Sequence, residues 1–224
     1  MKTTIVIPVF NEVESLPKLL ELLGEITSEE TKFLLVDNGS SDPTVREMLM
    51  EKSDKWQSVR TETNLGFGGG ILFGVESSKT EYVGWMPGNL KIDPREVVQI
   101  LDSNLIAEVD FLKARRVSRG LIPRIKTFLA GILQSLLLRT RLFDTGGTPT
   151  VCKRSFFSNL KNIPTDYVFE SFIYFQARKK GLQIKRPEIH YGERSFGQSH
   201  WQRGIRSEIL LLMRILKSSR SWEF

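Results

Sequence analysis

Four short segments in the first half of the chain combine glycines with carboxylate, amide or ammonium side chains. They are Pro8-Val9-Phe10-Asn11-Glu12, Asp37-Asn38-Gly39-Ser40-Ser41-Asp42, Asn64-Leu65-Gly66-Phe67-Gly68 and Met86-Pro87-Gly88-Asn89-Leu90-Lys91. Such side chains can exchange hydrogen bonds with a polar ligand, and a lysine can neutralise a phosphate. Each segment follows a strand-like run, and ligands of open α/β sheets bind outside the carboxyl ends of the strands. We therefore expect the four segments to form one binding site.

The elements that must position these segments alternate between strands and helices. The predicted strands are Thr3 to Pro8, Lys32 to Asp37, Ser58 to Glu62 and Glu81 to Met86. The predicted helices are Val13 to Leu23, Pro43 to Met50 with Asp42 as its N-cap, Gly69 to Ser77 and Pro94 to Asp102. This alternation is typical of βαβ units around a mostly parallel sheet.

The second half has a different pattern. We expect a strand at Asp110 to Arg115, a long helix within residues 119–141, a helix at Asp166 to Lys180, a strand at Gln183 to His190 and a terminal amphipathic helix from about Gln202 to Ser218. In the terminal helix, the apolar period predicts an inward face of Ile205, Ile209, Leu212, Met213 and Leu216. The basic long helix allows two interpretations, which are docking on an anionic membrane leaflet and burial in the core with exposed arginines.

Length, charge and cysteine content restrict the class of protein. A chain of 224 residues fits one large domain. Residues 1–112 hold 10 Lys and Arg against 19 Asp and Glu, whereas residues 113–224 hold 22 against 7, so we expect the second half to meet an anionic partner. Cys152 is the only cysteine, and neither a signal peptide nor a membrane-spanning run is evident. A cytoplasmic location, with access to the inner face of the membrane, is predicted.

Several functions are disfavoured by missing motifs. The run Gly66 to Gly70 lacks the third glycine of a dinucleotide-binding fingerprint, and no phosphate-binding loop of the P-loop type is present. His190 and His200 have neither a nucleophile elbow nor metal-ligand spacing. The basic residues come without the interleaved aromatics of a nucleic-acid surface. We therefore expect no organic cofactor and no nucleic-acid partner.

Taken together, these segments resemble family 2 glycosyltransferases of the GT-A fold, especially the dolichol-phosphate and polyprenol-phosphate sugar transferases. Thr4 to Glu12 is similar to that family's strand followed by P-x-Y/F-N-E, and Phe33 to Thr44 is similar to its V-D-D-G-S-x-D-x-T motif. Asn64-x-Gly66-x-Gly68 resembles its N-x-G-x-[GS] segment. The resemblance covers most of the chain and implies a GT-A-type α/β fold, a mostly parallel sheet flanked by helices.

The resemblance also implies a binding site for a UDP-, GDP- or dTDP-sugar. The backbone at Pro8 to Phe10 would form a wall for the base, Asp37 would accept a hydrogen bond from the base or ribose, and glycines would let the backbone approach the ligand. The expected nucleotide-sugar residues are Pro8, Val9, Phe10, Asn11, Glu12, Asp37, Asn38, Asn64, Gly66, Gly68, Gly88, Asn89 and Lys91.

One departure from the family concerns the metal. Family members commonly carry D-A-D-L-Q in the fourth segment, where the acidic pair holds a divalent ion such as Mg²⁺ or Mn²⁺. Pro87 and Asn89 occupy the two acidic positions here. Lys91 could instead place a fixed positive charge on the leaving diphosphate, so we expect weak metal dependence.

The acceptor side is expected in the second half. Asp144 to Arg154 is similar in placement to the family's D-T-x-S-G-F-R-x-Y-x-R, with Thr150 where the family has an arginine, and Arg194 to Trp201 resembles its R-x-x-G-x-S-K-W/L loop. Expected acceptor or phosphate contacts are Arg154, Arg194, Ser199, His200 and Trp201. Asp144 and Glu170 are the candidate catalytic carboxylates beside Lys91, and a base is needed only for a hydroxyl acceptor.

Together these features predict a glycosyltransferase. The resemblance further implies that it moves a sugar, by inversion, to a lipid-phosphate or glycan acceptor in lipid-linked or cell-surface glycan synthesis. The predicted domain is residues 1–201, with a nucleotide-sugar half at 1–112 and an acceptor half at 113–201, followed by a helix at 202–224. The missing acidic pair favours one alternative, a nucleotide-sugar-binding or regulatory protein with little catalysis. A sugar nucleotidyltransferase is disfavoured because no Gly-rich basic loop follows the first strand.

Overall fold

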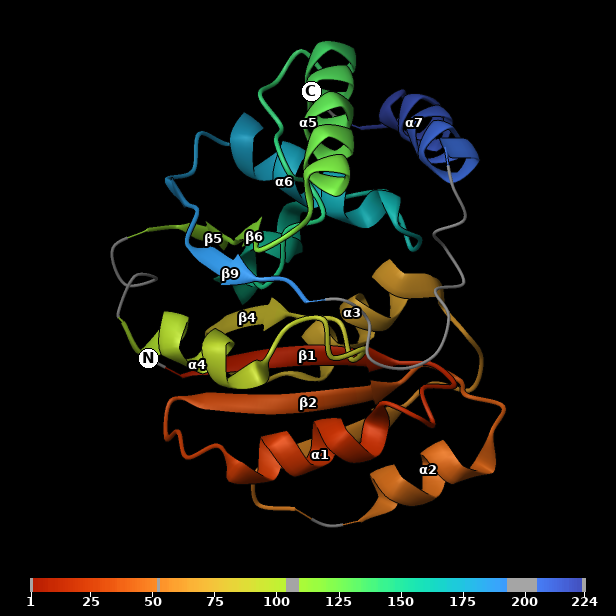
Figure 1. The fold of residues 1–224 in the computed structure, drawn as a ribbon, viewed down its shortest axis with the longest axis vertical. Coiled ribbons are helices and arrows are strands. Elements are labelled where there is room, and N and C mark those ends of the chain that lie inside the picture. The colour runs from red at the N-terminus through yellow and green to blue at the C-terminus, as the bar shows by residue number, and fades with distance from the viewer. Residues whose placement is uncertain (1, 52, 104–108, 193–204, 223–224) are drawn as a thin grey trace.

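The structure is a computed structural model that describes residues 2–51, 53–103, 109–192 and 205–222, with side chains of the last segment described from 209 onward. Figure 1 shows a sheet with helices on both faces and a group of helices at one end of the molecule. The α/β fold class predicted from the sequence is confirmed.

The first half alternates strands and helices as predicted. Its elements are β1 (Thr3–Val9), α1 (Leu16–Glu25), β2 (Thr31–Asp37), α2 (Pro43–Met50), β3 (Trp56–Arg60), α3 (Gly66–Ser77), β4 (Tyr82–Trp85) and α4 (Pro94–Asp102). Strands β3, β2, β1 and β4 are neighbours in this order and run parallel. Val9 pairs with Asp37 at the last register position, so the loops after β1 and β2 emerge side by side.

The second half adds antiparallel and short strands. Its elements are β5 (Phe111–Lys113), β6 (Arg115–Val117), α5 (Leu121–Leu137), β7 (Thr150–Lys153), the 3-10 helix η1 (Arg154–Asn159), α6 (Val168–Lys179), β8 (Ile184–Lys185), β9 (Glu188–His190) and α7 (Ile205–Ser219). The sheet order is β3-β2-β1-β4-β7-β5-β8, and β6 and β9 form a separate parallel pair. Each long strand predicted in this half is therefore two short strands that join different sheets.

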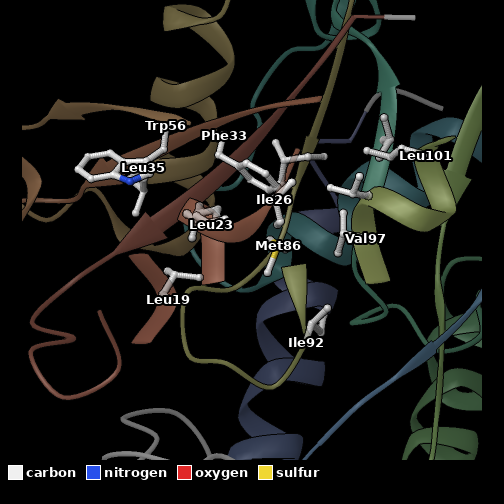
Figure 2. Close-up of a cluster of buried hydrophobic side chains, with 14 of the residues drawn as sticks. Leu19, Leu23, Ile26, Phe33, Leu35, Trp56, Met86, Ile92, Val97 and Leu101 are labelled. Carbon is white, nitrogen blue, oxygen red and sulfur yellow. The ribbon is translucent and has the colours of Figure 1, made fainter. Parts of the chain in front are cut away.

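Alternation along the strands creates two cores because successive side chains point to opposite faces. On one face Ile5, Ile7 and Val9 pack with α1, α2 and α4. Figure 2 shows part of this cluster, with Leu19 and Leu23 of α1 near Met86. On the other face Val6 packs with α3, α6 and α7. Both halves of the chain contribute to both cores.

Local signals explain the clearest helix starts. Asp42 caps α2 by accepting a hydrogen bond from the backbone N–H of Thr44 at 2.9 Å. Asp93 caps α4 in the same way through the N–H of Arg95. A proline follows each cap, and its fixed φ favours the first helical turn.

Helix α5 is present as predicted, but its burial in the core is not. Only Gly131 and Gln134 are buried along its length, whereas Leu129 and Leu136 are 53% and 72% exposed. Thr127, Gly131, Gln134 and Leu138 recur every three or four residues and form the covered side. The interpretation of this helix as a core helix is therefore wrong for most of its large apolar side chains.

The inward face predicted for the terminal helix is also wrong. In α7 the buried residues are Ile215 and Ser219, while Ile209, Met213 and Leu216 are exposed. The side chain of Ile205 lies outside the described part. The covered side is rotated because α7 rests on α6 through Ile215, and Trp222 packs against Phe172. Among the helices that the structure describes, none combines the length and apolar content required to cross a bilayer.

Candidate functional site

A cavity of about 490 Å³ lies between the loops after the parallel strands and the helices of the second half. Its lower wall comes from the segments after β1, β2, β3 and β4, and its upper wall from β6, α5, α6 and α7. It is lined by Pro8, Val9, Phe10, Glu12, Asn38, Asn64, Gly66, Phe67, Pro87, Gly88, Asn89, Lys91, Arg116, Arg119, Thr127, Ala130, Gly131, Gln134, Thr145, Gly146, Thr148, Tyr167, Glu170, Ser171, Tyr191 and Leu211. The predicted meeting of the four loops at one site is thus present in the structure.

Two asparagines hold the loops of the first half together. Asn11 donates its backbone N–H to Ser40 Oγ at 3.0 Å, and its side-chain oxygen accepts from the N–H of Ser41 at 2.9 Å. Asn38 joins the next loop, because its Nδ2 donates to Asn64 Oδ1 at 3.2 Å and its Oδ1 accepts from a backbone N–H of that loop. Asn38 and Asn64 line the cavity, whereas Asn11 lies outside its lining and acts as a clamp.

Asp37 lies beneath the loops, where it is only 2% exposed. Its carboxylate accepts hydrogen bonds from the N–H of Ser40 at 2.9 Å and from the guanidinium of Arg60 on β3. The side chain does not belong to the cavity lining. Direct contact of Asp37 with a base or ribose stays a prediction, and its visible role is to fix the loop after β2.

The loop after β4 brings Gly88, Asn89 and Lys91 into the cavity lining. Asn89 Oδ1 accepts from the backbone N–H of Lys91 at 3.3 Å, and the carbonyl of Lys91 accepts from the N–H of Gly192 at 2.9 Å. The first bond closes the turn from Asn89 to Lys91, and the second ties Lys91 to the segment that follows β9. The Lys91 ammonium lies 5.5 Å from the centroid of the Tyr191 ring.

Two arginines gather around the same tyrosine. The guanidinium carbon of Arg116 is 5.2 Å from the ring centroid of Tyr191, and that of Arg119 is 5.6 Å away. Both arginines line the cavity together with Lys91. We call Lys91, Arg116, Arg119 and Tyr191 the cation cluster. Asp144 offsets the charge of Arg116, so the three cations leave a net excess of two positive charges, which can bind an anion that carries more than one negative charge.

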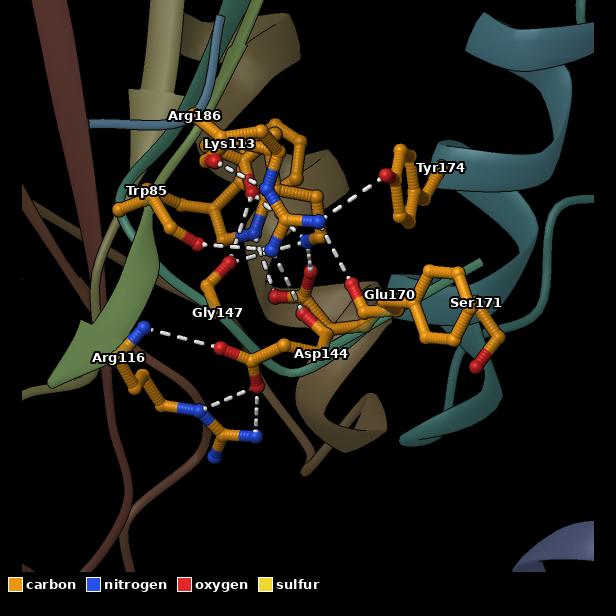
Figure 3. Close-up of polar contacts among 12 residues, drawn as sticks. Trp85, Lys113, Arg116, Asp144, Gly147, Glu170, Ser171, Tyr174 and Arg186 are labelled. Carbon is orange, nitrogen blue, oxygen red and sulfur yellow. Dashed lines mark hydrogen bonds and ion pairs between the residues drawn. The ribbon is translucent and has the colours of Figure 1, made fainter. Parts of the chain in front are cut away.

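Asp144 is held by Arg116 on β6. Its carboxylate accepts from the Arg116 backbone N–H at 2.9 Å, from Nε at 2.7 Å and from Nη2 (Figure 3). Burial acts to raise the pKa of Asp144, but the charge and hydrogen bonds of Arg116, with the charge of Arg186, outweigh it and hold this pKa below its ordinary value. Because Asp144 is already bonded and weakly basic, a role as general base stays a prediction that this geometry does not favour.

Glu170 on α6 lines the cavity, but both of its carboxylate oxygens already accept hydrogen bonds from side chains of the sheet. Oε1 accepts from Trp85 Nε1 at 2.7 Å, and Oε2 accepts from Lys113 Nζ at 2.9 Å (Figure 3). Lys113 is fully buried and also donates to the carbonyl of Gly147 and to Thr150 Oγ1. Burial lowers the pKa of Lys113, and the charge of Glu170 opposes this effect. The ion pair fixes the cavity floor, and catalysis by Glu170 stays a prediction.

Of the remaining predicted residues, Pro8, Val9, Phe10, Glu12 and Gly66 line the cavity. Gly68 does not line it, because a Cβ at this position would lie 2.6 Å from Phe169 Cβ, so this glycine serves the packing of α3 on α6. Arg194, Ser199, His200 and Trp201 lie outside the described residues.

Arg154 lies away from the cavity for a topological reason, so its contact with an acceptor or phosphate stays a prediction that this geometry does not favour. Strand β7 runs antiparallel to β4, with Lys153 opposite Tyr82. Arg154 therefore lies beside the start of β4, where its N–H donates to the carbonyl of Glu81 and its Nε to that of Thr80. It is absent from the cavity lining, which lies at the opposite ends of the parallel strands.

The sequence interpretation missed Arg116, Arg119, Gln134 and Tyr191 in the cavity wall. None of them belongs to a short motif, and Arg116 and Tyr191 meet only because β6 pairs with β9. The available signal was general, namely the excess of basic residues in the second half.

The described side chains do not form an acidic metal site. No group of three or more His, Cys, Asp or Glu among residues 2–51, 53–103, 109–192 and 205–222 could hold an ion. The side chains at positions 87 and 89 supply at most one neutral oxygen, that of Asn89, which is a poor donor set for Mg²⁺ or Mn²⁺. These two side chains therefore do not replace an acidic pair as ligands of a divalent ion.

Comparison with solved structures shows the GT-A glycosyltransferase fold. Glucosyl-3-phosphoglycerate synthase from Mycobacterium tuberculosis, in complex with Mn²⁺, uridine diphosphate and glucosyl-3-phosphoglycerate, aligns with a TM-score of 0.72 at 15% identity, over 98% of this chain and 79% of that chain. Staphylococcus aureus TarS, residues 1–349, aligns with a TM-score of 0.59 at 15% identity, over 99% and 72% of the two chains.

Sequence relatives point to the same family. Dodecaprenyl-phosphate galacturonate synthase of Rhizobium johnstonii is 24% identical over 72% of this chain and 50% of its own length. Undecaprenyl-phosphate 4-deoxy-4-formamido-L-arabinose transferase of an Enterobacter species is 24% identical over 89% of this chain and 62% of its own length. The chain thus spans one half to under two thirds of these relatives. The family description "Glycosyl transferase family 2" matches residues 4–161, and the chain belongs to glycosyl transferase family 2.

Proposed function

We propose that the chain transfers a sugar from a nucleoside diphosphate sugar to the phosphate of a polyprenyl lipid. The observation that carries this proposal is one cavity that joins the loops of the first half to the cation cluster and to α5. Its two walls offer separate places for a donor and an acceptor. Both sequence relatives named above are polyprenyl-phosphate sugar transferases, which supports this acceptor class.

The reaction needs few groups from the protein. An acceptor phosphate oxygen attacks the anomeric carbon, and the bond from that carbon to the diphosphate oxygen breaks with the electron pair leaving on the diphosphate. In-line attack inverts the configuration. A phosphate monoester, with a second pKa of about 6, is already anionic near neutral pH, so no general base is required. This agrees with the engaged carboxylates of Asp144 and Glu170.

The charge on the leaving diphosphate must be neutralised. Lys91 follows β4 at the cavity and lies with Arg116 and Arg119 around Tyr191. Fixed cations aimed at developing negative charge lower the barrier without reorganisation. We assign this task to Lys91, with the two arginines beside the entering acceptor phosphate.

The donor loops would hold the nucleotide. Pro8, Val9 and Phe10 provide an apolar wall, and Asn38 and Asn64 present amides at the cavity. The choice among uracil, guanine and thymine bases and the identity of the sugar are to be found by experiment. Because the acceptor class resides in a membrane, we place the reaction at the inner membrane face.

A donor panel tests the proposal. The purified chain is incubated with UDP-, GDP- and dTDP-sugars and a short-chain polyprenyl phosphate in detergent, and products are identified by mass spectrometry, with and without EDTA. A glycosylated lipid phosphate is expected with at least one donor. Donor binding by calorimetry without product from any acceptor would instead favour a binding protein, and absence of both would refute the proposal.

A further inference from the structure

Helices α5 and α7 carry most of the exposed large hydrophobic residues in the described part of the chain. Of the fifteen large hydrophobic residues that are exposed in the described part of the chain, seven lie on α5 and four on α7. The α5 set is Leu121, Ile122, Ile125, Phe128, Leu129, Leu133 and Leu136, and the α7 set is Ile209, Leu210, Met213 and Leu216. Both helices lie at the same end of the molecule, away from α1 and α2 (Figure 1).

The apolar sides of both helices face away from the protein. At about 100° per residue, the seven α5 residues fall within an arc of about 140° on the side opposite Thr127, Gly131 and Gln134. The four α7 residues likewise lie opposite Ile215 and Ser219, which are buried. Ordinary surface helices bury their apolar side against the protein. Helices α5 and α7 instead expose their apolar sides to the surroundings.

The charge around these faces is mostly positive. Residues 119–141 contain five basic residues and no acidic residue, and residues 205–222 contain four basic residues and one acidic residue, Glu208. Arg124, Lys126, Arg139, Arg141, Lys217 and Arg220 are exposed. A broad apolar face flanked by arginine and lysine is the pattern of a helix that lies in the interface of an anionic bilayer, with its long cations reaching the headgroups.

We propose that α5 and α7 together form a docking surface for an anionic lipid leaflet. This inference deepens the proposed function, on which its link to the acceptor rests. The covered side of α5 lines the cavity through Thr127, Ala130, Gly131 and Gln134, and α7 contributes Leu211. Docking would therefore bring the cavity wall that carries Arg119 close to the headgroup layer. A phosphate at the end of a membrane lipid could then reach the cation cluster without leaving its leaflet.

Vesicle binding tests this surface without any donor or acceptor. The chain is sedimented with vesicles of neutral phosphatidylcholine and with vesicles that also contain phosphatidylglycerol. We expect sedimentation with the anionic vesicles, weaker sedimentation with the neutral ones and a decrease with rising salt. The variant Leu129→Glu with Leu136→Glu, and separately Met213→Glu, should lower the partition coefficient about 10-fold or more. Arg124→Glu with Lys126→Glu should lower binding to anionic vesicles by a similar factor.

The chain offers a matched control in Met50, which is 70% exposed on α2. Met50→Glu introduces the same change on another part of the surface and should bind vesicles like the wild type. Circular dichroism and the unfolding midpoint establish that every variant is folded. Unchanged vesicle binding in both α5 and α7 variants overturns the proposal. The proposal is also overturned if the wild type is a dimer that does not bind vesicles and these variants convert it to monomers. In that case a second copy of the chain covers the surface.

Activity assays separate this proposal from the proposed function. With a detergent-dispersed short-chain acceptor, the Leu129→Glu/Leu136→Glu variant should transfer sugar at the wild-type rate, whereas with a vesicle-embedded acceptor its rate should fall. Equal rates in both formats contradict docking but leave transfer intact. Vesicle binding without transfer by any variant contradicts the proposed function and leaves the docking surface intact.

Discussion

Helices α1 and α5 share an apolar period but bury opposite sides. Helix α1 covers its face of the sheet with Leu16, Leu19 and Leu23, all fully buried. Helix α5 exposes its leucines and turns Gly131 and Gln134 toward the protein. The period of a sequence therefore predicts that a helix forms, but the neighbours decide which side is covered. In α5 the covered side lines the cavity of the candidate site. Small residues there leave space in the cavity, and polar residues can form hydrogen bonds with a bound molecule.

The largest effect is expected below α5, in the polar floor of the cavity. Lys113→Met leaves the Glu170 carboxylate buried without its cation, and breaking a buried pair costs about 3–5 kcal/mol of the free energy of unfolding. Urea unfolding of Lys113→Met, of Glu170→Gln and of the double variant measures the coupling energy between the two side chains. The double variant should be more stable than the sum of the single losses predicts. Strict additivity would show that the two side chains are not coupled.

A pair of identical substitutions tests the contrast between the two helices directly. Leu19→Ala in α1 opens a cavity in the core and should lower the free energy of unfolding by about 2–5 kcal/mol. Leu129→Ala in α5 removes an exposed side chain and should change it by about 0.5 kcal/mol or less. Chemical denaturation of both variants is the measurement. Similar losses at the two positions would mean that α5 packs its leucines against the protein.

A smaller stability effect than in the buried core is expected at Asp144, and it should depend on pH. Its lowered pKa means that the ionised form stabilises the fold above the unfolded pKa of about 3.9, and that this stabilisation is lost as the pH falls through the lower folded value. Asp144→Asn should cost about 1–3 kcal/mol near pH 7, with a smaller difference from the wild type below pH about 4. Asp102→Asn on the exposed end of α4 is the control, and a pH-independent cost at Asp144 would contradict the ion pair with Arg116.

The first half of the fold was predictable because its signals are local. Asp42 with Pro43 and Asp93 with Pro94 mark two helix starts within a few residues. The four loops converge because consecutive parallel strands end at one edge, a rule that needs no knowledge of side-chain packing. For this reason most predicted donor residues, including Asn38 and Lys91, line the cavity.

The second half was less predictable because its site depends on long-range pairing. Arg116 and Tyr191 come together only through the β6 and β9 pair. Arg154 ends a motif-like segment, yet the antiparallel direction of β7 places it at the opposite edge of the sheet from the cavity. The outward face of α7 likewise follows from its contact with α6, which the helical period alone does not specify.

We propose that fixed cations at this cavity support sugar transfer to a lipid phosphate. The transfer rate of Lys91→Ala in EDTA tests this role most directly. Lys32→Ala, an exposed lysine at the start of β2, is the matched control. We predict that the wild type and Lys32→Ala transfer sugar in EDTA, while the rate of Lys91→Ala falls about 10²–10³-fold. Transfer that stops in EDTA, returns with Mn²⁺ and is unaffected by Lys91→Ala would contradict the claim.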